Sequence, residues 1–197
     1  MKEEERPRVT VNGVEIDNVY TFEYLGSQQQ CDGEDDSDVK HRMDIAQARF
    51  TSLFHLWADH RLSIPLRLRL FCTAVCSTFS HASEAWDMTE TVMKKINGFN
   101  SRCLHFITGK SYRETAVNPD FNLLRSIRQR RLRYLGHILR LPPDQLLRRS
   151  LFAYIAGWDT VPEGSLIADC PPGLSLENLA EIVADRKSWA EMVDNIT

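Results

Sequence analysis

The chain has 197 residues, of which 43% are hydrophobic and 26% are charged, and its formal net charge is −3 at pH 7. This length and composition are those of a folded domain with a sizeable core, and they exclude wholesale disorder. No apolar stretch approaches the roughly 20 residues that a membrane span needs, and residues 1–8 are too charged for a secretory signal. We therefore expect a protein of the nucleus or cytoplasm that does not contact a membrane.

The small net charge hides a strong segregation of charge along the chain. Residues 1–60 carry six Lys or Arg and thirteen Asp or Glu, residues 61–150 carry sixteen and six, and residues 151–197 carry two and eight. A basic middle between acidic flanks predicts a surface that faces a polyanion. The alternative is that the three blocks neutralise one another within one fold.

The first 30 residues predict a small antiparallel β-ribbon. Asn12-Gly13, flanked by β-branched residues, suits a type I′ turn, because both central residues of that turn take a positive φ. A second extended run over residues 19–25 alternates in polarity and is stopped by Gly26. Residues 28–38 are expected to form a polar, acidic loop.

From residue 37 onward the apolar residues recur at helical spacing. The expected fold class is therefore mostly α: a helical bundle with a small N-terminal antiparallel β-ribbon. The second helix is mostly apolar, so we expect it to be the central and most buried one. Gly109 is the predicted stop of the third helix, Asn118-Pro119-Asp120 the start of the fourth, and Ser175 the cap of the last. The predicted helices span residues 37–57, 63–79, 91–107, 118–141, 144–155 and 175–192.

Three units follow from this organisation: a ribbon over residues 1–30, a helical bundle with a basic helix over 31–156, and a loop with an acidic C-terminal helix over 157–197. The sequence shows no internal repeat.

The predicted fourth helix is the candidate binding site, because arginines are concentrated on it. Arginine suits phosphate because its planar fork donates two parallel hydrogen bonds and stays charged at any relevant pH. An interleaved tyrosine can stack on a base or sugar. The residues that we predict to contact nucleic acid are Arg125, Arg128, Arg130, Arg131, Arg133, Tyr134, His137 and Arg140.

Four apolar residues of the same helix, Leu124, Ile127, Leu135 and Ile138, are expected to form a narrow stripe that faces the core. Arg148 and Arg149 lie just beyond the helix and would extend its basic surface. The alternative interpretation is that the arginine face is solvated or pairs with the acidic flanks.

Neither metal chemistry nor catalysis finds support in the sequence. The five cysteines are odd in number and scattered, which argues against a disulfide framework. Cys72 and Cys76 have the spacing of half a metal site, but buried free thiols are the expectation. The acidic run over residues 32–38 lacks the ordered spacing of a calcium loop. Because no Gly-rich phosphate loop, GxSxG elbow or HExxH pair is present, we predict no catalytic residue, no metal and no cofactor.

Three segments of the sequence occur in the same order as in a known protein family. The first is the Asn12-Gly13 hairpin that leads into Tyr24-Leu25-Gly26-Ser27, the second is the helix ending at Trp57 followed by Ser83-Glu84-Ala85-Trp86, and the third is residues 130–140. In this order they resemble the region after the catalytic palm in LINE-type (non-LTR) retrotransposon endonuclease–reverse transcriptases. That family shows an NG hairpin with a "YLGS" strand, a "YGxExW" segment and a "RRLRWLGHVLRM" segment. Residues 184–189 are similar to its "A-DR-x-x-W" ending.

The resemblance implies a thumb-like fragment of a transposable-element reverse transcriptase. The family's catalytic aspartates lie upstream in a palm, so the isolated chain is not expected to be an enzyme. Its helices would grip RNA, RNA–DNA hybrid or DNA through the backbone, without reading the sequence. Tyr24, Leu25, Gly26 and Ser27 would be primer-grip-like, and the missing palm is a candidate protein partner. Two other functions stay open: a helical module that contacts an acidic protein, and an inert translated transposon fragment.

Overall fold

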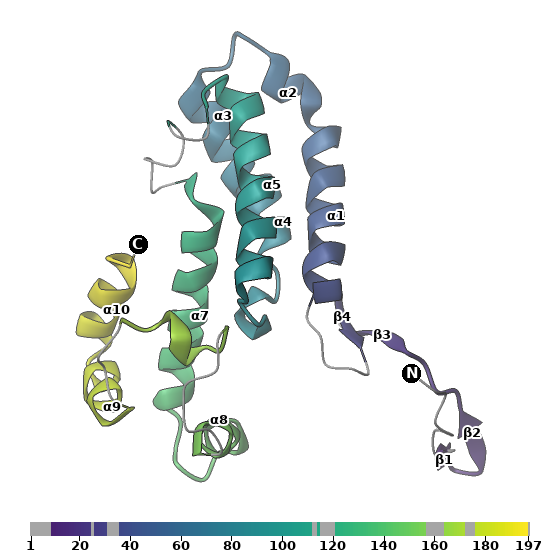
Figure 1. Cartoon of the computed structure of the whole chain (residues 1–197), viewed down its shortest axis with the longest axis vertical. Coiled ribbons are helices and arrows are strands. Elements are labelled where there is room, and N and C mark those ends of the chain that lie inside the picture. Colours follow the sequence, from purple (N-terminus) through teal and green to yellow (C-terminus); the bar gives the residue numbers. More distant parts are fainter. Residues whose placement is uncertain are drawn as a thin grey trace.

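The structure is a computed structural model that describes residues 9–24, 26–30, 36–111, 114, 121–156, 164–171 and 176–196. A β-ribbon at the N-terminal end leads into a set of helices, several of them long and aligned side by side (Figure 1). The described residues are mostly helical, which confirms the predicted fold class. None of the helices in these ranges is both long and apolar enough to cross a membrane.

The first hairpin pairs β1 (Val9–Val11) with β2 (Val14–Ile16) in antiparallel register. Its turn is formed by Asn12 and Gly13, with φ of 53° and 79°. Positive φ at both central residues is what a type I′ turn requires. The predicted hairpin is therefore confirmed.

The second hairpin pairs β3 (Thr21–Tyr24) with β4 (Ser27–Gln30), and the two hairpins are separate two-stranded sheets. Gly26 has a φ of 80° in the connection, so it turns the chain and does not end the ribbon. The prediction of a loop from residue 28 was wrong. Residues 28–30 are three successive glutamines, which do not alternate in polarity, so no pattern predicted the strand β4.

The helical segments follow in chain order, with η1 a π-helical turn and η2 and η4 short 3₁₀ helices. They are α1 (Asp36–Ser52), α2 (Phe54–Ala58), α3 (Ile64–Phe71), η1 (Cys72–Cys76), α4 (Ser77–Phe79), η2 (Ser83–Ala85), α5 (Glu90–Thr108), α7 (Leu123–Leu139), α8 (Leu146–Ala156), η4 (Ile167–Asp169), α9 (Leu176–Ala184) and α10 (Arg186–Asp194).

The ends of α5 and α7 show how local sequence sets helix boundaries. Gly109 has a φ of 69° and donates its backbone N–H to the His105 carbonyl, which confirms the predicted stop of α5. The predicted start of α7 at Asn118-Pro119-Asp120 lies outside the described residues. The structure begins α7 later, where the side chain of Asn122 accepts a hydrogen bond from the backbone N–H of Arg125.

The C-terminal segment also differs from its prediction, because it contains two helices and not one. Asp185 has extended backbone dihedral angles, and its carboxylate accepts the backbone N–H of Lys187, so it caps α10. A carboxylate followed by a second periodic stretch is a helix start signal that the continuous apolar pattern concealed. The predicted cap, Ser175, lies outside the described residues.

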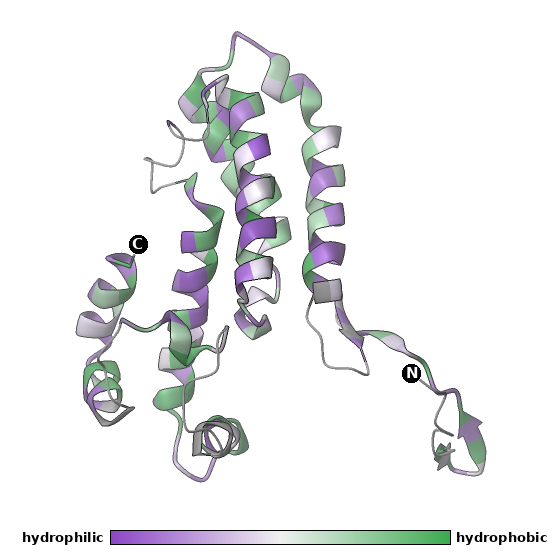
Figure 2. Cartoon of the chain, in the orientation of Figure 1, coloured by the Kyte–Doolittle hydropathy of each residue, from purple (hydrophilic) through white to green (hydrophobic). Residues whose placement is uncertain are grey.

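Two hydrophobic clusters form the core, and α7 belongs to both. The larger one joins α1, α3, η1, α4 and α5 to the first half of α7. The smaller one joins the second half of α7 to α9, α10 and part of α8. Hydrophilic and hydrophobic residues alternate along α1, α5 and α7, as in helices that turn one face to a core (Figure 2).

The most buried helix is therefore α7 and not the one predicted. Nine of the seventeen residues of α7 are buried. By contrast, only five residues are buried between Ile64 and Phe79. The predicted stripe on α7 is confirmed, since Leu124, Ile127, Leu135 and Ile138 are all at most 8% exposed.

Candidate nucleic-acid interface

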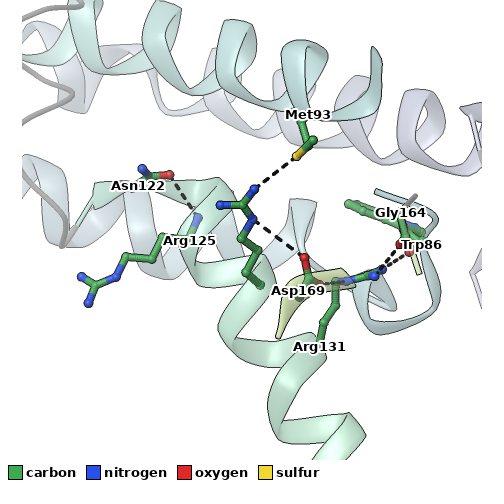
Figure 3. A network of polar contacts seen from close by, with 8 residues as sticks. Trp86, Met93, Asn122, Arg125, Arg131, Gly164 and Asp169 are labelled. Carbon is green, nitrogen blue, oxygen red and sulfur yellow. Dashed lines mark hydrogen bonds and ion pairs between the residues drawn. The ribbon is translucent and has the colours of Figure 1, made fainter. Parts of the chain in front are cut away.

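The predicted nucleic-acid-binding residues lie on different faces of α7, and one of them is inaccessible. Arg131 is 1% exposed. Its guanidinium donates to the Trp86 carbonyl, to the Gly164 carbonyl at 2.7 Å and to the Asp169 carboxylate (Figure 3). A buried guanidinium is tolerated only when its donors are paired in this way. Arg131 therefore holds three segments of the fold together and presents no donor to a ligand outside it.

Arg128 lies beside Arg131 and is partly buried with it. Its Nε is 3.8 Å from Asp169 Oδ1, and its Nη2 is 3.4 Å from the sulfur of Met93 on α5. Asp169, which has a 7% exposed side chain, thus faces two arginines. Arg128 and Arg131 are best described as part of the junction between α5, α7 and η4.

A second row on α7 faces the C-terminal end of α10. Arg125 donates to the carbonyls of Asp194 and Ile196, both at 2.7 Å, and Gln129 donates to the Val193 carbonyl at 3.3 Å. The last carbonyls of a helix have no intrahelical partner, so these side chains cap α10. Arg125 is consequently engaged within the fold as well.

One accessible part of the predicted site is a groove between η2 and α7. Its volume is about 690 Å³. We call it the Arg-Tyr groove and define it by its lining residues, Ala82, Glu84, Ala85, Arg130, Arg133 and Tyr134. Three of the eight predicted residues, Arg130, Arg133 and Tyr134, therefore line one open hollow.

Both arginines of the Arg-Tyr groove hold a carboxylate. Arg130 donates from Nε and Nη2 to one oxygen of Glu84, at 2.9 and 2.6 Å, and from Nη1 to the Ser80 hydroxyl at 3.3 Å. Arg133 donates from Nη2 to Asp194 Oδ1 at 2.8 Å. The side chains of Arg130 and Arg133 remain 39% and 56% exposed. Both therefore keep guanidinium surface in contact with solvent.

The exposed end of α7 carries the remaining predicted residues. His137 and Arg140 are exposed, and Arg140 donates to the Val183 carbonyl at 3.3 Å. Partial burial lowers the pKa of Arg140, and the positive charge of nearby Arg186 lowers it further by a smaller amount. Arg148 is turned back on the fold, where it donates to the Leu141 carbonyl at 2.5 Å and lies over the Phe152 ring.

The residues predicted to be primer-grip-like, positions 24–27, belong to the second hairpin. This hairpin is linked to the Arg-Tyr groove through α1. Tyr24 is exposed and stacks on Phe22, Ser27 pairs with Tyr24, and Leu25 lies outside the described residues. The Gly26 carbonyl accepts a hydrogen bond from Arg42, which also donates to His81 Nδ1 at 2.8 Å. His81 directly precedes Ala82, which lines the groove and has a φ of 58°.

A second α1 residue, Asp38, makes a parallel link. Its carboxylate accepts the Gln28 backbone N–H and the Trp86 indole N–H, at 2.8 and 2.7 Å. Asp38 and Arg42 lie one turn apart on α1, so the same helix face holds the hairpin and the segment that borders the groove. The sequence prediction placed Asp38 where the acidic loop meets the first helix and missed this role.

The described cysteines are free thiols, and the pKa of three of them is raised. Burial raises the pKa of Cys103 and of Cys170 to about 12. A hydrogen bond with Cys72, together with burial, raises the pKa of Cys76 well above its usual value. Within the described ranges, no group of three His, Cys, Asp or Glu side chains is placed to hold a metal ion.

The alternative that the arginine face pairs with the acidic flanks holds for Asp169 and Asp194, which lie in the C-terminal flank. The sequence prediction named no individual partner, although one signal for the burial of Arg131 was available. Arg131 stands four residues after Ile127 and four before Leu135, so it lies on the stripe that was predicted to face the core. That position predicts burial. The partners Glu84, Asp169 and Asp194 are 46, 38 and 61 positions away, and periodicity within one helix carries no information about them.

Comparison of the chain with protein-family models, with curated proteins and with solved structures gave no match.

Proposed function

We propose that the chain binds the backbone of nucleic acids at the Arg-Tyr groove, without reading their sequence. The observation that carries this proposal is that Arg130, Arg133 and Tyr134 line one open groove, and that the side chains of both arginines are partly exposed. A guanidinium fork binds a phosphate with two parallel hydrogen bonds, and an aromatic ring stacks on any base or sugar. The two chemistries together suit a single strand, or the exposed end of a duplex.

The charge distribution supports the same ligand class. The basic block of residues 61–150 includes α7, and the groove opens on that helix. Each phosphate that a guanidinium neutralises releases counterions from the nucleic acid, which favours binding and makes it dependent on salt. RNA, RNA–DNA hybrid and DNA all present this backbone, so all three belong to the proposed ligand class.

The resemblance to LINE-type reverse transcriptases gives the proposed function a context, that of a thumb-like region. Two of the resembling segments pack against each other in the fold. A Cβ placed on Gly136 would overlap the Trp189 indole, so the glycine allows the indole to contact the α7 backbone. This contact supports treating residues 130–140 and 184–189 as parts of one structural unit.

A salt titration tests the proposal. We expect the fluorescence anisotropy of a labelled single-stranded oligonucleotide to report binding that weakens steeply from about 50 to about 200 mM salt. Replacing Arg133 and Tyr134 together by alanine removes one phosphate contact and the stacking ring, so binding should weaken roughly tenfold or more. Arg69→Ala, which removes an exposed arginine of α3, is the matched control and should change binding little.

Absence of binding at about 50 mM salt, by folded samples of the wild type and of a Glu84→Gln variant that lacks the carboxylate held by Arg130, would contradict the proposal. Equal losses in the Arg69→Ala control and in the groove variant would also contradict it, because general charge alone would then explain the affinity. An inert transposon fragment predicts the first of these outcomes.

A second candidate function, a protein-interaction module, is favoured by the first hairpin. The side chains of Val9, Val11, Val14 and Ile16 are on one face of the strand pair and are 49–68% exposed. An isolated two-stranded sheet is only marginally stable in water, so a protein surface that covers this face would stabilise it. Replacing Val11 and Val14 by threonine should leave nucleic-acid binding intact and weaken a protein contact.

A further inference from the structure

The arginines of the Arg-Tyr groove are already neutralised from within the chain. Glu84 of η2 accepts two hydrogen bonds from Arg130, and Asp194 at the end of α10 accepts one from Arg133. These carboxylates occupy guanidinium donors that a phosphate would use. They come from segments 46 and 61 positions away, so the fold brings each of them to the groove.

The two pairs are exposed enough to be exchanged for an external anion. The side chains of Glu84 and Asp194 are 27% and 65% exposed. Ion pairs at such positions are weakened by water and salt, unlike the buried pair of Arg131 with Asp169. A guanidinium fork accepts a carboxylate or a phosphodiester, and each of these anions carries one negative charge.

We propose that Glu84 and Asp194 are internal competitors of nucleic acid, so that the Arg-Tyr groove is autoinhibited by its own carboxylates. This inference rests on the proposed function of the groove. A polyanion must displace both carboxylates before its phosphates contact both arginines fully. Glu84 is the stronger competitor, because it accepts two hydrogen bonds from Arg130 and is less exposed than Asp194.

Amide substitutions separate the charge of each carboxylate from its shape. In Glu84→Gln the side-chain oxygen still accepts a hydrogen bond from Arg130, so residues 83–85 keep their place against α7. The negative charge is lost, so the ion pair becomes a hydrogen bond between a charged donor and a neutral acceptor, and the attraction between opposite charges is removed. The phosphate therefore meets a weaker competitor, and Asp194→Asn acts in the same way on Arg133.

The experiment uses the full chain and a fluorescent single-stranded oligonucleotide in anisotropy titrations at constant salt. We expect Glu84→Gln to lower the Kd about tenfold and Asp194→Asn about threefold, in line with the different strengths of the two charge-assisted pairs. Thermal melting of each variant verifies that it is folded. The double variant should bind more tightly than either single one.

Two controls separate local competition from a general change in charge. The variant Asp44→Asn/Glu90→Gln removes two exposed carboxylates of α1 and α5, outside the residues that line the groove, and should change the Kd less than twofold, because exposed charges are screened. In an Arg130→Ala background, Glu84→Gln should give no gain, because the arginine that it frees is missing.

Autoinhibition is overturned when the wild type binds and Glu84→Gln binds no more tightly. It is also overturned when the control variant gains equally, or when the gain persists without Arg130. In these cases the proposed function of the groove stands. When neither the wild type nor the amide variants bind at about 50 mM salt, the proposed function fails and the inference fails with it. Binding by the amide variants alone supports the inference.

Discussion

Two neighbouring regions of α7 use the same residue type for different purposes. At the junction with η4, Arg131 is 1% exposed, and its guanidinium has three acceptors from other segments. In the Arg-Tyr groove, the side chains of Arg130 and Arg133 are 39% and 56% exposed, and each holds one carboxylate. Adjacent positions on a helix point about 100° apart, so one turn holds a structural arginine and a solvent-facing one.

The density of arginine on a helix predicts the charge of that helix, but it does not predict which guanidinium groups are free to bind a ligand. A buried guanidinium cannot be exchanged for an external ligand without leaving its acceptors unpaired. An exposed one can, because water replaces the lost partner. Arg125 lies between these limits, since it is half-buried and caps α10 through two carbonyls. We therefore expect substitutions at Arg131, Arg125 and Arg133 to lower the free energy of unfolding by successively smaller amounts.

The largest effect is expected at the buried arginine. Replacing Arg131 by methionine leaves the Asp169 carboxylate, which is 7% exposed, without its closest cation, and leaves the carbonyls of Trp86 and Gly164 without a donor. We expect a loss of about 3–5 kcal/mol in the free energy of unfolding, measured by urea denaturation. The added substitution Asp169→Asn should recover part of this loss. A variant as stable as the wild type would show that the junction contributes nothing.

An intermediate effect is expected at Arg125. In Arg125→Ala the terminal carbonyls of α10 lose two charge-assisted hydrogen bonds, but water reaches part of the site. We expect a loss of about 1 kcal/mol, below the range for fully buried charged hydrogen bonds. Faster hydrogen exchange of the α10 amides should accompany it, with the α1 amides unchanged. Equal acceleration in both helices would contradict a local capping role.

The sequence predicted most of the helical fold because its signals there are local. The apolar stripe of α7, the Asn12-Gly13 turn and the Gly109 stop depend only on neighbouring residues, and all three are found in the structure. The break at Asp185 was missed because the apolar pattern continues across it. Periodicity predicts which residues of a helix face the core. It does not predict a break in the helix when the residues on both sides of the break face the same core.

The candidate site was predicted less well, for a physical reason. Which arginine is free depends on where distant acidic residues come to lie. Glu84 reaches Arg130 because η2 packs against α7, and Asp194 reaches Arg133 because Trp189 of α10 packs onto Gly136. These are tertiary contacts that follow from the completed fold. Only the burial of Arg131 was within reach of the sequence, through its place on the apolar stripe.

The smallest effect on stability is expected in the groove. Arg133→Ala removes one exposed ion pair with Asp194, whose side chain is 65% exposed, and such pairs contribute about 0–1 kcal/mol. We therefore expect a urea midpoint close to that of the wild type, whereas nucleic-acid binding should weaken at low salt. This separation of stability from binding is what distinguishes a ligand-facing arginine from a structural one. A loss of stability as large as that of Arg131→Met, with unchanged binding, would move Arg133 to the structural set and leave Arg130 as the only arginine that the groove offers to a phosphate.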